Sequence, residues 1–157
     1  SIQNTIPALD FRSSITTQEG SVNRVELNPD WPWSRDFRIS QGVRVGETVY
    51  VSGQGPIAAD GRLVGADDML TQSRQVFDNI HQVLALAGAT LDDVVKITAF
   101  LTDLDRYDEY KAARAEAFLD RIPASSTVHS PQLLIPGMMV EVEAVAVLTV
   151  PRSSAPA

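Results

Sequence analysis

Cysteine is absent from this 157-residue chain, and several other features that would assign it to a functional class are scarce. Without cysteine there is no disulfide, no thiolate nucleophile and no cysteine-based metal site, which fits a reducing compartment. The two histidines, His81 and His129, lack the paired spacing of a metal site. We therefore expect no bound metal.

Long apolar runs and basic clusters are also missing. No apolar segment approaches the roughly 18 residues that a membrane span needs, so no membrane-spanning helix is expected. Residues 1–7 lack the basic-then-apolar order of a secretory signal, and we expect a cytoplasmic protein. The formal charge is −7 and no lysine or arginine cluster stands out. Phosphate binding depends on basic residues, so nucleic acid is not an expected partner.

The length and composition predict one globular domain, with 44% hydrophobic and 21% charged residues. Residues 1–20 show no sustained periodicity and are interpreted as an arm or a loose tail. The domain is expected to span residues 21–150. Residues 151–157 form a polar C-terminal tail.

Hydrophobic patterning predicts six extended segments and two helices. The strands are expected over residues 22–27, 37–45, 48–52, 94–101, 123–129 and 138–147, and the second and third form a hairpin. Asp67 and Asp68 supply an acidic start for the first helix, and Gly88 supplies its end. The second helix is expected over residues 103–119, capped by one of its first aspartates. This order predicts an α+β fold, a two-layer sandwich with two helices on one face of a six-stranded mixed sheet.

The last expected strand is apolar on both of its faces. Val140 and Val142 lie on one side, whereas Glu141 and Glu143 share the other side with a methionine and two further valines. Two helices cannot cover both faces of six strands, so the open face is expected to meet copies of itself in a symmetric oligomer. The two glutamates would then be half-buried, where a carboxylate needs a partner, a water molecule or a catalytic task.

Six motifs follow one another along the chain. They are Gln41-Gly-Val-Arg-Val-Gly46, Val49-Tyr-Val-Ser-Gly-Gln54, Asp78-Asn-Ile80, Ala87-Gly-Ala-Thr-Leu-Asp-Asp-Val-Val-Lys96, Pro123-Ala-Ser-Ser-Thr127 and Val140-Glu-Val-Glu-Ala144. Together they resemble the RidA/YjgF family, the reactive-intermediate deaminases formerly described as endoribonuclease L-PSP-like, from about Phe37 to Val150. The resemblance implies a chorismate-mutase-like fold and a homotrimer with clefts between neighbouring subunits.

The resemblance also implies an activity. Active members hydrolyse enamines and imines derived from amino acids, releasing ammonia and a 2-oxo acid, and they use no metal or cofactor. In them an arginine that follows Pro-Ala binds the substrate carboxylate. Here Ser125 stands in its place and cannot provide that charged, two-pronged contact. A tyrosine of the family corresponds to Ile39.

Other family positions match and predict the site. Gly53 is the position where the backbone approaches the ligand, and Glu141 is the acid that orients the attacking water. Thr127 occupies a pocket position where the family often has cysteine or threonine. Ser125, Thr127 and His129 alternate onto one face of a strand, so we expect a polar wall opposite Glu141. His129 is interpreted as a residue of the pocket edge rather than a catalyst.

Three functions remain open at this point. The first is hydrolysis of a C=N bond in a small metabolite by a water that Glu141 activates, with Arg35 or Arg38 meeting a substrate carboxylate. The second is a non-catalytic member that binds a small metabolite or a partner protein in the same cleft, which the serine at position 125 favours. The third, endoribonuclease activity, is disfavoured by the acidity of the chain.

Overall fold

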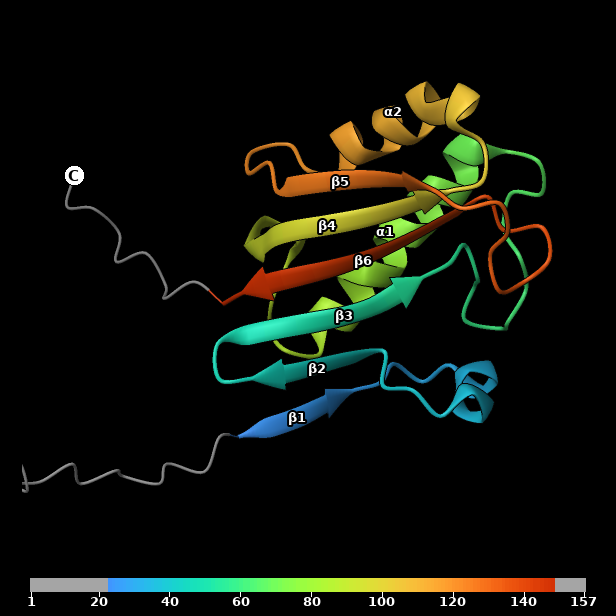
Figure 1. Ribbon diagram of the computed structural model, residues 1–157. Coiled ribbons are helices and arrows are strands. Elements are labelled where there is room, and N and C mark those ends of the chain that lie inside the picture. The colour runs from blue at the N-terminus through green and yellow to red at the C-terminus, as the bar shows by residue number, and fades with distance from the viewer. Residues whose placement is uncertain (1–22, 149–157) are drawn as a thin grey trace, which may run out of the picture.

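The computed structural model describes residues 23–148, so the predicted arm, the C-terminal tail and both margins of the predicted domain lie outside the described residues. The described part forms one six-stranded sheet with two α-helices on one of its faces (Figure 1). The strands are β1 (Arg24–Leu27), β2 (Gly42–Val45), β3 (Thr48–Gln54), β4 (Val94–Leu101), β5 (Ala124–His129) and β6 (Val140–Val147). The predicted α+β sandwich is confirmed.

The strand order is β1-β2-β3-β6-β4-β5, which places β6 in the middle of the sheet. It runs antiparallel to β3 and to β4, while β4 and β5 are parallel to each other. A parallel pair needs a crossover connection, and α2 (Tyr107–Ala117) supplies it here. Neither α-helix within residues 23–148 combines the length and apolarity that crossing a bilayer requires.

The first helix, α1 (Met69–Ala85), begins where its acidic start predicts. The Asp68 carboxylate accepts a hydrogen bond of 2.9 Å from the backbone N–H of Thr71, which caps the first turn. Beyond the end of α1, Gly88 has a φ of +71°, a left-handed conformation that glycine adopts without strain. One apolar stripe of α1 is buried against the sheet.

The predicted strand over residues 37–45 is wrong in its first half. Residues 32–37 form the 3-10 helix η1 (Pro32–Phe37), and β2 starts only at Gly42. Pro32 fixes φ in the first turn, and Trp31 and Trp33 stack with ring centroids 6.1 Å apart. Alternation alone could not reveal this turn, because proline geometry and aromatic stacking set its course.

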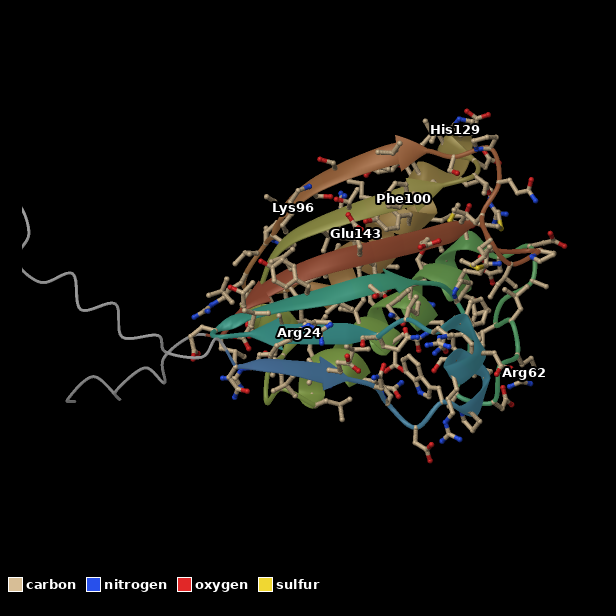
Figure 2. The ribbon with its side chains drawn as sticks, turned by 60° about the horizontal axis from the view of Figure 1, so that its bottom comes forward. Arg24, Arg62, Lys96, Phe100, His129 and Glu143 are labelled. Carbon is tan, nitrogen blue, oxygen red and sulfur yellow. The ribbon has the colours of Figure 1, made fainter. Side chains whose placement is uncertain are left out.

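The face of the sheet turned away from the helices is open, as the two-sided pattern of β6 predicts. Figure 2 looks onto it, with Lys96, Phe100 and Glu143 on its strands. Apolar side chains stand exposed there, including Tyr50 at 53% and Val128 at 44%. No helix within residues 23–148 covers this face (Figure 2).

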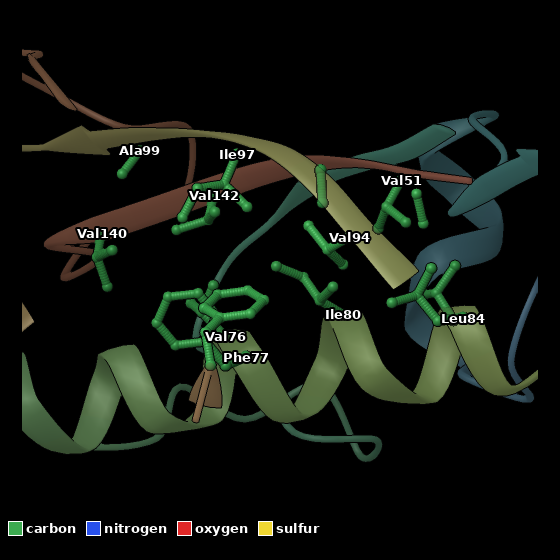
Figure 3. Packing of buried hydrophobic residues seen from close by; sticks show 14 of the residues in the cluster. Val51, Val76, Phe77, Ile80, Leu84, Val94, Ile97, Ala99, Val140 and Val142 are labelled. Carbon is green, nitrogen blue, oxygen red and sulfur yellow. The ribbon is translucent and has the colours of Figure 1, made fainter. Parts of the chain in front are cut away.

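The core lies between the other face and the helices (Figure 3). Side chains of α1 pack against β3, β4 and β6, and they are fully or almost fully buried. The labelled members of this cluster are Val51, Val76, Phe77, Ile80, Leu84, Val94, Ile97, Ala99, Val140 and Val142. On β6 the residues at even positions enter this core, so those at odd positions, Glu141 among them, must lie on the open face.

Candidate functional site

Glu141 is a half-buried carboxylate in the first half of β6. It forms no hydrogen bond or ion pair with the other residues that the structure describes. Burial raises its pKa above the ordinary glutamate value, and the charge of Glu143 on the same face raises it further. Such an acid has free lone pairs for a water molecule and holds a proton closer to neutral pH than an exposed glutamate does.

Gly53 makes room for this carboxylate. The pairing of β3 with β6 changes register between Val51 and Gln54, which turns the Gly53 backbone towards Glu141. A Cβ atom at position 53 would collide with Oε1 of Glu141 and lie 2.9 Å from its Cδ. Only glycine therefore allows the carboxyl group to rest against the backbone of β3.

The two residues open into a hollow of about 110 Å³, called here the Glu141 hollow. Its remaining lining is mostly apolar, and Ile39 stands at its rim with 53% of its surface exposed. The apolar lining residues are Trp33, Phe37, Ile39, Ile57, Leu134, Ile135 and Met138. A single acid in apolar surroundings favours a small ligand that is largely neutral.

Two buried amides of α1 hold the walls of the Glu141 hollow. Asn79 donates from Nδ2 to the carbonyls of Gly55 at 3.0 Å and Ile57 at 2.9 Å. Gln72 donates from Nε2 to the Gly137 carbonyl at 2.9 Å and accepts from the Met139 N–H at 2.8 Å. Sequence reasoning gave neither residue a role in the site, although polar residues seven apart within an apolar helical stripe were a readable signal.

A second hollow, of about 520 Å³, lies between α2 and the start of β5 and is called here the Arg114 hollow. Arg114 donates from Nη2 to the Tyr107 hydroxyl at 2.9 Å and makes a long contact of 3.4 Å from Nη1 to Oγ of Ser125. Its guanidinium also lies over the rings of Tyr107 and Tyr110, 5.7 and 5.3 Å from their centroids. Thr127 lines the same hollow.

The structure divides the predicted site residues between these two hollows. Ser125 and Thr127 pair with the buried residues of β4 and therefore point to the helix side of the sheet. Glu141 and Gly53 lie on the open side, together with Ile39. Within one chain, the predicted polar wall opposite Glu141 is therefore not formed.

The remaining predicted residues line neither hollow. His129 ends β5 as an exposed side chain (Figure 2) and is absent from the lining of both hollows. Arg35 donates to Asp30 at 2.9 Å on the surface, and Arg38 is exposed. Arg114, a cation that does line a hollow, was missed, although it falls on the same helical stripe as Tyr107 and Tyr110.

The donors needed for a metal are not gathered anywhere in the described part. Among residues 23–148, no group of three or more histidines, aspartates and glutamates could hold a metal ion. The chemistry that the described residues offer is that of a half-buried acid without a partner and a partly buried guanidinium.

Comparison with known proteins identifies the family. A family profile described as Endoribonuclease L-PSP matches residues 36–148. A RutC family protein from Sulfurisphaera tokodaii is 39% identical over 94 residues, which cover 60% of this chain and 75% of that protein.

Two crystal structures share the fold. The structure of YyfA from Yersinia pestis, described as a protein of unknown function of the Rid family, is 35% identical with a TM-score of 0.74, covering 80% of this chain and 100% of that one. Rv2704 from Mycobacterium tuberculosis, described as a member of the YjgF/YER057c/UK114 family, is 32% identical with a TM-score of 0.70 and the same coverage of 80% and 100%. The chain therefore belongs to the Endoribonuclease L-PSP family, the RidA/YjgF family that its motifs resemble.

Proposed function

We propose that this protein hydrolyses the C=N bond of a small imine, or of the enamine that tautomerises to it, with Glu141 activating the water. One observation carries the proposal: a half-buried acid with a raised pKa and no partner within the described residues rests against the Gly53 backbone in an apolar hollow. Groups with perturbed pKa values cluster at functional sites, and one that lies in a hollow is a candidate for such a site.

The chemistry needs one group that first accepts and then donates a proton. Water forms a C–O bond to the imine carbon and loses a proton to the Glu141 carboxylate, while the π electrons move to the nitrogen, which then takes this proton from Glu141. In the resulting carbinolamine, Glu141 accepts the hydroxyl proton and passes it to the nitrogen as the C–N bond breaks, so that ammonia leaves and a carbonyl group remains. An acid whose pKa is raised towards the working pH suits both steps.

We place this reaction in a cleft between subunits of a homotrimer. In a single chain the open face of the sheet is uncovered, and Ser125 and Thr127 of β5 do not face Glu141. The exposed apolar residues of the open face, among them Tyr50, Val128 and Val147, call for a covering surface. Pairing of subunits would also allow Ser125 and Thr127 of one protomer to line the substrate beside Glu141 of its neighbour, with His129 at the rim. The cysteine-free composition fits action in the cytoplasm.

The test measures ammonia release from imines that an amino-acid oxidase generates from a panel of amino acids. Wild-type protein should accelerate release, and Glu141→Gln should reduce the acceleration by about 10² to 10⁴-fold, the range typical of a lost general base. Glu143→Gln is the matched control, since it removes the neighbouring carboxylate and should retain most activity. No acceleration with any imine, or equal rates for wild type and Glu141→Gln, would overturn the proposal.

A non-catalytic role is the second candidate, and Ser125 favours it. The resemblance implies that active relatives carry an arginine at this position, so the chain lacks their main contact to a substrate carboxylate. In that case small metabolites would raise the thermal unfolding temperature without being turned over, which the same panel measures.

A further inference from the structure

Arg114 is a cation without a negative partner among the described residues. The six ion pairs within residues 23–148 all involve other side chains. Burial raises the pKa of the adjacent Tyr110, and the Arg114 charge only partly opposes this, so Tyr110 is neutral at physiological pH. The guanidinium is thus desolvated in part and not neutralised.

The hollow around Arg114 has a positive lining although the whole chain is acidic. Lys111 is a second cation on its wall, and none of the residues that line it is an aspartate or a glutamate. The formal charge of the chain is −7, with 20 acidic and 13 basic residues. A cation-lined hollow in such a chain attracts anions locally, against the overall field.

The guanidinium is also held in a fixed position. Tyr107 accepts its Nη2 hydrogen bond, and the rings of Tyr107 and Tyr110 lie beneath it. By contrast, the 3.4 Å contact from Nη1 to Ser125 is too long to be strong. A donor therefore remains available on the side of the hydroxyls of Ser125 and Thr127, so an anion can bind without reorganising the arginine.

The other half of the hollow is apolar. Leu119 and Ile122 stand at it with 78% and 86% of their surfaces exposed, beside the buried ring of Phe118. Large apolar side chains held in water next to a cation suit a ligand with a charged end and an apolar body. A carboxylate matches the planar guanidinium, and an apolar acid matches the walls.

We propose that the Arg114 hollow binds the carboxylate of a small organic acid with an apolar body. Arg114 makes the charged contact, Lys111 adds positive potential, and the hydroxyls of Ser125 and Thr127 complete the polar end. A cation from α2 thereby compensates for the serine on β5. The binding of an organic acid by this hollow does not depend on the proposed function. Only the further step, that the bound acid is an imine derived from an apolar amino acid, rests on the proposed function.

The experiment titrates the full chain with benzoate and with benzamide, a neutral molecule of the same shape, by calorimetry. Wild type should bind benzoate at least tenfold more tightly than benzamide. Arg114→Gln should weaken benzoate binding at least tenfold and erase the preference, whereas Arg74→Gln, the same change on a surface arginine of α1, should leave it intact. Equal binding of the two probes by wild type, no benzoate binding, or undiminished binding by Arg114→Gln would overturn the proposal.

One further variant keeps the outcome interpretable. If Arg114→Gln does not fold, Arg114→Lys retains the charge without the planar guanidinium that can make two hydrogen bonds to one carboxylate. This variant should bind benzoate more weakly than wild type does but more tightly than it binds benzamide. Benzoate binding without imine turnover would then refute the hydrolase alone, and turnover without a preference for benzoate would refute this site alone.

Discussion

The Glu141 hollow and the Arg114 hollow are opposite in charge and lie on opposite faces of one sheet. Each contains a partly buried charge that no described residue neutralises. Elsewhere within residues 23–148 the chain pairs partly buried charges, as in the bidentate contact of Arg106 with Glu109, at 2.6 and 2.8 Å. Two charges kept apart in two hollows are therefore better explained by a ligand than by stability.

The hollows also differ in how the chain builds them. The Arg114 hollow comes from the continuous segment 107–127. The Glu141 hollow gathers segments 33–41, 53–57 and 134–141, which are far apart in the sequence and are tied together by amides of α1. Changes in distant core residues should therefore disturb the Glu141 hollow and spare the Arg114 hollow.

The largest effect should follow from Gly53→Ala. The new methyl group would displace the Glu141 carboxylate, and a shift of about 1 Å can cost about 10²-fold in rate. Imine hydrolysis should fall accordingly, while benzoate binding at Arg114 should be unchanged. Combining Gly53→Ala with Glu141→Gln should be no worse than Glu141→Gln alone, because both act on the same carboxylate. Additive losses would contradict this explanation.

Next in size is the effect of Gln72→Leu on stability. The change leaves the Met139 N–H and the Gly137 carbonyl without their partner, which should lower the free energy of unfolding by about 2 kcal/mol. Urea denaturation measures it. Gln82→Leu, the same change at a half-exposed position of α1 where the amide bonds only the exposed side chain of Asp78, should have little effect. Equal effects of the two variants would show that Gln72 does not anchor the 137–139 segment.

The sequence predicts the Glu141 hollow better than the Arg114 hollow, and the reason is physical. On β6 the two faces differ in polarity, so alternation alone places Glu141 on the side away from the core. On β5 both faces carry small polar residues, and Ser125 and Ser126 are equivalent by alternation. Which of them faces α2 is set by the pairing of β5 with β4, which no local pattern reveals.

The assignment of the β5 side chains to the two faces of the sheet leads to a prediction about benzoate binding with a smaller expected effect. Thr127→Val removes one neutral hydroxyl from the Arg114 hollow and should weaken benzoate binding two- to tenfold, as expected for about 0.5–1.5 kcal/mol. Thr98→Val is the matched control, because Thr98 lies on the open face of the neighbouring strand. If both variants weakened benzoate binding equally, Thr127 would have no specific part in the site.

The smallest effect concerns the stability cost of Glu141. Because burial raises its pKa, the folded state holds the proton more tightly than the unfolded chain, whose glutamate pKa is near 4.5. Stability contributed by this group is therefore lost as the pH rises above 4.5, and the loss is complete above the raised pKa. Glu141→Gln should stabilise the protein at pH 8 by a few tenths of a kcal/mol, because solvent screens a half-exposed group. In urea denaturation the gain should vanish near pH 4, and a destabilised variant at pH 8 would mean that the carboxylate has a stabilising partner in the folded protein.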